Sequence, residues 1–177
     1  MSPDFSKNHF ALFGLPVDFN VDLPSLDRTY RDVQREVHPD RFANAPDAEK
    51  RVAAQWATQA NEAYRVLKSP LARGRYVLHL NGIDTEEESN TAMPVPFLMQ
   101  QMEWREAVVD AKAAHDEAAL TQLAAEQRAQ EQALFALLAQ QLAAAATMPD
   151  GRATVRKLRF LEKLGEEIDL ANEAIES

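Results

Sequence analysis

Apolar residues recur at intervals of three and four along most of this 177-residue chain, which is the spacing of one face of an α-helix. Alternating runs of Val, Ile and Thr with hairpin dipeptides are missing, and only five glycines interrupt a sequence rich in Ala, Leu, Gln and Glu. We therefore expect an all-α protein whose hydrophobic content, 46%, suffices for one sizeable core or two small ones.

The first half contains two short and two long predicted helices. A short apolar segment over residues 8–13 is closed by Gly14 and Pro16. A helix over residues 23–37 ends before Pro39, since the residue preceding a proline is driven out of the α region, and a loop then runs to Pro46. Its core face is predicted to consist of Leu26, Tyr30, Val33 and Val37.

A third helix is predicted over residues 47–68, antiparallel to the second. A fourth begins at Ser69, an N-cap followed by a proline in the first helical position, and stops near Asn81 and Gly82. The third helix has an apolar face of Trp56, Ala60, Ala63, Tyr64 and Leu67.

A polar stretch bounded by prolines follows. Residues 83–96 include Glu86, Glu87, Glu88 and Asn90, and such a stretch buries little, so we interpret it as a linker. Three helical patterns lie beyond it, at 97–114, 116–146 and 153–175, and the short turns between them indicate an antiparallel three-helix bundle. The expected domains are therefore 1–82, a linker at 83–96, and 97–177.

The leucines of the second bundle helix could also belong to an intermolecular coiled coil. Two amphipathic helices are available in the same chain, however, so the sequence favours an intramolecular bundle and a monomer.

Composition excludes several classes of function. The net charge of −9 repels phosphate backbones and anionic lipid, so neither nucleic acid nor a membrane is an expected partner. The chain has no cysteine, no signal-peptide pattern in Met1–Lys7 and no apolar stretch of roughly 20 residues, which favours a cytoplasmic protein.

The histidines and glycines give no sign of a metal or cofactor site. The four histidines have no i, i+4 partner ligand, and no glycine-rich phosphate loop or serine elbow is present. We expect no metal, no bound cofactor, no catalytic residue and no enzymatic activity.

One tripeptide stands out, His38-Pro39-Asp40, at the end of the helix over residues 23–37. Arg28, Arg31 and Arg35 fall opposite the core stripe of that helix and must face solvent or a partner. A purely structural interpretation is a proline helix stop, with His38 capping carbonyls and Asp40 bonding within a turn. The functional interpretation is that Pro39 fixes the backbone and presents His38 and Asp40 at one corner for recognition.

The first 80 residues resemble the J-domain family. The resemblance rests on Phe10-Ala11-Leu12-Phe13-Gly14-Leu15, on Tyr30-Arg31, on His38-Pro39-Asp40-Arg41, and on Asn61-Glu62-Ala63-Tyr64-Arg65-Val66-Leu67 before Ser69-Pro70. It implies a helical hairpin that docks on a seventy-kilodalton heat-shock ATPase and stimulates its ATP hydrolysis. By resemblance, the chaperone-binding residues are Arg28, Arg31, Arg35, His38, Pro39, Asp40 and Arg41.

The second half resembles the HscB-type co-chaperones of iron-sulfur cluster assembly. The similarity lies in Phe97-Leu98-Met99-Gln100-Gln101-Met102-Glu103 and in Thr154-Val155-Arg156-Lys157-Leu158-Arg159-Phe160-Leu161. It implies an HscA-type chaperone and an IscU-type scaffold protein as partners. By resemblance, the scaffold-binding residues are Leu98, Met99, Met102, Glu103, Glu106, Asp110 and Phe160.

The pattern of residues 97–111 agrees with such a role. Phe97, Trp104, Val108 and Ala111 share one arc of the helix, and the six scaffold-binding residues of this helix, Leu98 to Asp110, occupy a roughly opposite arc. Leu98, Met99 and Met102 could instead cover the linker or the first domain. Two other functions also stay open: an enzyme with His38 and Asp40 as acid and base or as metal ligands, and a J-protein for generic unfolded clients.

Overall fold

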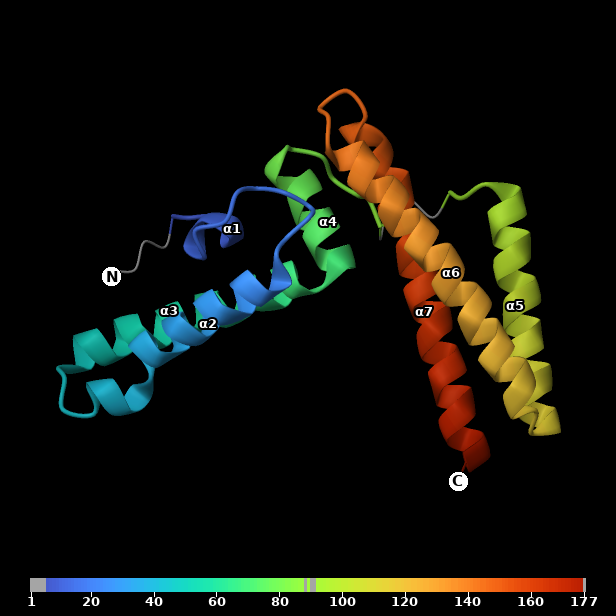
Figure 1. Ribbon diagram of the computed structural model, residues 1–177, viewed down its shortest axis with the longest axis horizontal. Coiled ribbons are helices and arrows are strands. Elements are labelled where there is room, and N and C mark those ends of the chain that lie inside the picture. The colour runs from blue at the N-terminus through green and yellow to red at the C-terminus, as the bar shows by residue number, and fades with distance from the viewer. Residues whose placement is uncertain (1–5, 88, 90–91, 177) are drawn as a thin grey trace. The chain divides into compact units, whose positions relative to one another are not determined.

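The computed structural model describes residues 6–87, 89 and 92–176, and every regular element within them is a helix (Figure 1). The expected all-α class is confirmed. The chain forms two compact units, residues 1–77 and 78–177. None of the described helices is long and apolar enough to cross a bilayer.

The first unit is built on an antiparallel pair of helices, α2 (Leu23–Val37) and α3 (Asp47–Lys68), visible side by side in Figure 1. The predicted apolar face of α2 packs against α3. Leu26, Val33 and Val37 are buried, and the ring of Tyr30 stacks on that of Tyr64 in α3 with centroids 3.9 Å apart. Burying one such leucine contributes roughly 1.5–3 kcal/mol, so this stripe holds the pair together. The short helix α1 (His9–Leu12) packs on α3.

Polar contacts cross the α2/α3 pair at its exposed edge. The Lys68 ammonium lies 2.7 Å from the Asp27 carboxylate, which also accepts a hydrogen bond from the Tyr64 hydroxyl at 2.9 Å. These hydrogen bonds from Lys68 and Tyr64 lower the pKa of Asp27. They fix the register of the two helices at the end away from His38.

A buried arginine ties the loop before α2 to the end of α3. Arg73, in α4 (Pro70–Leu80), donates from Nε to the carbonyl of Phe19 at 2.6 Å and from Nη1 to the carbonyl of Leu67 at 2.5 Å. Its guanidinium also lies over the Phe19 ring, 5.1 Å from the centroid. Burial lowers the pKa of Arg73, and the two carbonyls replace the water that it loses. Sequence periodicity gave no sign of this contact.

The second unit contains the three helices of the predicted bundle: α5 (Val95–Ala114), α6 (Glu117–Leu142) and α7 (Gly151–Glu176), with a short 3₁₀ helix, η2 (Met148–Asp150), before α7. Gln127 of α6 is buried and donates from Nε2 to the carbonyl of Leu161 at 2.9 Å. Gly165 leaves room for it, since a Cβ there would lie 3.3 Å from that nitrogen. One apolar cluster in this core consists of Val108, Ala111, Leu120, Leu164, Ile168 and Ala171.

Helix ends in the bundle differ from the sequence expectation at the start of α5, at both ends of α6 and at the start of α7, which begins at Gly151 and not at residue 153. Helix α5 begins at Val95, before the expected position 97, because Pro96 fits the first turn of a helix, where its missing N–H costs nothing. Asp116 is the N-cap of α6 and accepts a hydrogen bond from Ala119 N at 3.0 Å. Helix α6 ends at Leu142 and not at 146, and the Thr147 hydroxyl donates to the carbonyl of Gln141 at 2.9 Å.

The expectation that residues 83–96 bury little is wrong for the start of that stretch. Thr85 is buried, and the Glu87 side chain is only 5% exposed. Residues 84–87, which we call the acidic strap, lie along α7: Glu86 pairs with Arg152 at 3.3 Å and Arg156 at 3.6 Å, and Glu87 with Arg159 at 3.4 Å. The expected linker residues Glu88 and Asn90 lie outside the described residues. The domain boundaries at 82/83 and 96/97 stay a prediction.

Glu131→Gln is expected to stabilise the bundle at neutral pH. Burial and the neighbouring Glu162 carboxylate raise the pKa of Glu131, with Arg128 opposing the shift. A raised carboxyl pKa destabilises the folded state above that pKa and has no effect below the unfolded value near 4.5, so the gain should disappear as the pH falls below that value. Because the site is only partly buried, we expect a gain below about 1 kcal/mol.

Urea unfolding at pH 7 and pH 3.5 measures this gain. Glu103→Gln, at an exposed position of α5, controls for the change in net charge. An equal gain in both variants, or a gain that persists at pH 3.5, would contradict the assignment to Glu131.

Candidate functional site

The corner at His38 is formed by a proline between two helices. His38 has ψ of 133°, well outside the helical region, and this ends α2 at Val37 as predicted. The next residues form a 3₁₀ helix, η1 (Pro39–Phe42), where a loop was expected; proline in its first position already has the required φ.

The His38 ring caps η1. Its Nδ1 accepts a hydrogen bond from the backbone N–H of Asp40 at 3.3 Å, so in the neutral ring Nε2 carries the proton. This differs from the expected cap on the preceding helix. The side chain of His38 is 59% exposed and that of Asp40 is 90% exposed. Both are therefore open to a partner molecule, as recognition requires.

The basic face of α2 and the His38 corner open onto one surface groove. Arg28, Arg31 and Arg35 are all exposed, and Arg35 pairs with Asp32 at 3.0 Å. An exposed pair of this kind contributes little to stability, so a carboxylate of another protein can replace Asp32. Nine residues line the groove: Arg31, Gln34, Arg35, Val37, His38, Pro39, Arg41, Ala57 and Asn61.

Five of the seven predicted chaperone-binding residues lie in this groove, and Arg28 and Asp40 do not. Helix α3 contributes Ala57 and Asn61, which the sequence analysis did not select. Asn61 accepts a hydrogen bond from the Tyr30 hydroxyl at 2.9 Å, and that hydroxyl accepts one from Gln34 at 2.7 Å. Asn61 begins the segment 61–67 on which the J-domain resemblance partly rests, so the sequence marked the position. Its hydrogen bond with Tyr30 of α2 could be found only from the folded structure.

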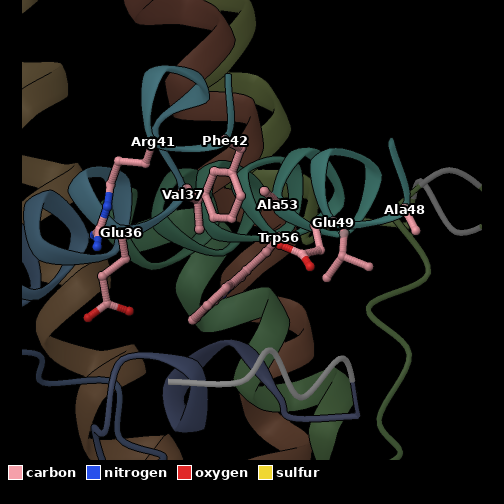
Figure 2. Close-up of a pocket in the computed structure, with 9 residues that line it drawn as sticks. Glu36, Val37, Arg41, Phe42, Ala48, Glu49, Ala53 and Trp56 are labelled. Atoms are coloured by element: carbon pink, nitrogen blue, oxygen red, sulfur yellow. The ribbon is translucent and has the colours of Figure 1, made fainter. Parts of the chain in front are cut away.

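Two residues of η1 anchor the corner to the helix pair. Arg41 donates from Nη1 to the carbonyl of Arg35 at 3.4 Å. Phe42 faces a second groove, together with Val37, Ala53 and Trp56, as Figure 2 shows. Those three side chains are buried and Phe42 is half-buried, so the ring fastens η1 to the hydrophobic core of the pair. The remaining lining residues of this groove are Glu36, Arg41, Ala48, Glu49 and Val52.

A second candidate surface lies on α5. Met99 and Met102 are 56% and 63% exposed, which is unusual for large apolar side chains, and Leu98 is half-buried beside them. The acids Glu103, Glu106 and Asp110 are exposed. All these residues lie opposite the buried arc that includes Phe97, Val108 and Ala111, in agreement with the predicted division of the helix.

Phe160 adds to this surface from α7. It is half-buried, and its ring meets that of Phe97 edge to face, with centroids 6.1 Å apart. Because Phe97 is buried in the bundle, this contact joins Phe160 to the bundle core. The binding roles of the seven predicted residues stay a prediction.

Neither surface resembles a metal centre. Among the described residues, no group of three or more His, Asp or Glu side chains has the arrangement of a metal site. His9, a possible metal-ligand type, instead packs in the first unit: its ring stacks on that of Tyr76 with centroids 4.2 Å apart, and the Glu62 carboxylate is a nearby charge. Burial lowers the pKa of His9, which fits a packing role.

Comparison with known proteins gives consistent results for both halves. Residues 93–169 match the family model of the HSCB C-terminal oligomerisation domain. The chain is 52% identical over 159 residues to the "Co-chaperone protein HscB homolog" of Ralstonia nicotianae, covering 90% of each chain. It is 48% identical over 177 residues to the protein of the same name in an Azoarcus strain, covering 100% of each chain.

Two solved structures share the fold. "Chaperone HscB from Vibrio cholerae" superposes with a TM-score of 0.84 at 37% identity, covering 96% of this chain and 99% of the other. Human co-chaperone protein HscB superposes with a TM-score of 0.89 at 29% identity, covering 96% and 84%. With an all-helical fold of a J-domain followed by a helical bundle, and with relatives this similar over nearly its whole length, the chain belongs to the HscB family of co-chaperones.

Proposed function

We propose that this protein stimulates the ATPase of an HscA-type heat-shock chaperone and delivers an IscU-type scaffold to it during iron-sulfur cluster maturation. The observation that carries the proposal is the exposed His38-Pro39-Asp40 corner, held rigidly beside the arginines of α2. Family membership adds the role of co-chaperone. We further propose that the chain itself catalyses no reaction and acts by binding alone.

Charge supports the docking step. Arg31, Arg35 and Arg41 line one groove in a protein that is acidic overall, so this groove would attract an acidic surface of the ATPase. Docking of this kind is fast and weakens with salt. His38 and Asp40 would then contact the ATPase at the end of the docked helix.

The exposed face of α5 supports the delivery step. A patch of Leu98, Met99, Met102 and Phe160 with acids on its border suits a folded protein whose apolar contact is surrounded by basic residues. A J-protein for generic unfolded clients would use the same patch on denatured chains. Monomeric state and cytoplasmic location stay predictions.

A steady-state ATPase assay of the chaperone separates these functions. We expect this protein and the folded scaffold together to stimulate ATP hydrolysis more than the sum of their separate effects. Synergy with a denatured polypeptide and none with the scaffold would favour the generic J-protein.

His38→Gln is expected to abolish stimulation of the chaperone ATPase, because a glutamine lacks the ring that both contacts the partner and caps η1 through Nδ1. Scaffold affinity and the circular dichroism spectrum should not change. His79→Gln, at an exposed position of α4, is the matched control and should stimulate normally. Full stimulation by His38→Gln would count decisively against this proposal.

Phe42→Ala is expected to reduce maximal ATPase stimulation, since η1 loses the ring that lies beside Val37 and Ala53 in the groove that Figure 2 shows. The half-buried ring should also contribute roughly 1–3 kcal/mol to stability, measured by urea unfolding. Phe42→Leu should restore most of both quantities. Val52→Ala, on the border of the same groove and 41% exposed, should stimulate like the wild type. Normal stimulation by a destabilised Phe42→Ala would show that η1 needs no anchor.

Leu98→Ala combined with Met102→Ala is expected to weaken scaffold binding by more than about 1 kcal/mol, as truncation of interface anchors does. Isothermal titration calorimetry with purified scaffold measures the change. Leu137→Ala, at a 41% exposed leucine of α6, is the control and should bind normally. Unchanged affinity in the double variant would remove this patch from the proposed interface.

A further inference from the structure

Two exposed apolar side chains of the bundle lie outside the predicted scaffold-binding set. Val109 of α5 is 65% exposed and Leu170 of α7 is 63% exposed, as much as Met102. Single exposed apolar residues are common and need no explanation. These two, however, lie on neighbouring helices, α5 and α7.

Contacts between α5 and α7 fix their relative level. The two helices run in the same direction, since α6 connects them as an antiparallel neighbour. Phe97 meets Phe160 near their beginnings, and further along Arg105 of α5 pairs with Glu167 of α7 at 3.1 Å. The residue numbers of the two partners differ by 63 in the first contact and by 62 in the second. The two helices therefore keep nearly the same register along their length.

Val109 and Leu170 lie one turn beyond the Arg105–Glu167 pair. Val109 follows Arg105 by four residues and Leu170 follows Glu167 by three, which places them about 6 Å and about 4.5 Å further along parallel axes. Both are therefore at nearly the same level, on the outward side of the α5/α7 junction.

The surface of α5 continues without interruption to this level. Residues Leu98, Met102, Arg105 and Val109 follow one another at intervals of four, three and four, so they form one ridge on the α7 side of α5. Its length from Leu98 to Val109 is about 16 Å. The exposed acids Glu103, Glu106 and Asp110 lie on the other side of the outward face.

We propose that Val109 and Leu170 form a second apolar contact for the same folded client protein that binds Leu98, Met99, Met102 and Phe160. This inference rests on the proposed function. The client surface extends along α5 from Leu98 to Val109. The Arg105–Glu167 pair, with side chains 36% and 45% exposed, separates its two apolar parts.

Val109 and Leu170 adjoin the predicted scaffold-binding site, which indicates that the same client protein covers them. Asp110, at the far end of that site, is adjacent to Val109, so a client that reaches Asp110 also covers the level of Val109 and Leu170. A standard interface buries about 800 Å² and involves roughly 20–30 residues on each partner, so the client is expected to contact more residues than the seven of the predicted site. The acids beside the ridge favour a client whose apolar contact is flanked by Lys or Arg.

Calorimetry on the full chain with purified scaffold tests the second contact. Val109→Ser combined with Leu170→Ser should weaken binding by about fivefold or more, and ATPase stimulation without the client should not change, because both residues are outside the His38 groove. Leu137→Ser is the matched control for an exposed leucine made polar and should bind normally. Circular dichroism verifies folding.

Charge variants test the chemistry of the client. Val109→Arg should weaken binding more than Val109→Glu, since a client flanked by basic residues repels the arginine. Equal effects of the two charges would contradict the proposed basic border.

The remaining outcomes distinguish this inference from the proposed function. If Leu98→Ala with Met102→Ala loses affinity while the Val109 and Leu170 variant binds normally, the second contact is wrong and the delivery function stands. If neither variant loses affinity, the delivery function fails and this inference with it. If the wild type sediments as a dimer that the Val109 and Leu170 variant does not form, and client affinity is equal, the surface joins two copies of this chain and the inference is overturned.

Discussion

Pro39 imposes the constraint on which the first unit depends. Because Pro39 excludes His38 from the α region, the chain leaves α2 at Val37 and turns at once into η1. That turn directs the chain back toward α3 and brings Phe42 to the groove that Val37, Ala53 and Trp56 also line. The same turn leaves His38 and Asp40 exposed at the end of the helix pair. A position without a proline would allow α2 to continue, and neither the corner nor its anchor would form.

Rigidity around this corner comes from contacts on both of its sides. Arg41 holds the carbonyl of Arg35, and Tyr30, Gln34 and Asn61 form a hydrogen-bonded series across the two helices. A partner that binds here meets groups already in position, so little conformational entropy is lost on docking. The candidate surface on α5 differs from this preformed corner. Met99 and Met102 are exposed, and the unbranched side chain of methionine can adapt its shape to a protein partner.

Local sequence signals predicted the hairpin well and the contacts between distant segments poorly. The bounds of α2 and α3 agree with the expectation because prolines and the Ser69 hydroxyl, which accepts from Ala72 N at 3.3 Å, end or begin the helices. The expected end of α6 at residue 146 was too late, because residues 143–146 are all alanine, a strong helix former, and the sequence carries no stop signal at Leu142. The burial of Arg73 depends on Phe19, 54 residues away, which no periodicity shows. In the candidate sites, residue types and helical faces were predictable, whereas Asn61, Phe42 and Leu170 required the packing of one helix on another.

The acidic strap changes what the bundle presents to a partner. Arg152, Arg156 and Arg159 lie on one side of α7, next to Phe160, and unpaired they would give that side a positive potential. Glu86 and Glu87 neutralise most of this charge within the chain. Glu103, Glu106 and Asp110 of α5 then meet less opposing charge beside the apolar patch, where the Lys157 ammonium lies 5.8 Å from the centroid of the Phe97 ring. A segment outside the three helices therefore helps to set which sign of charge the bundle attracts.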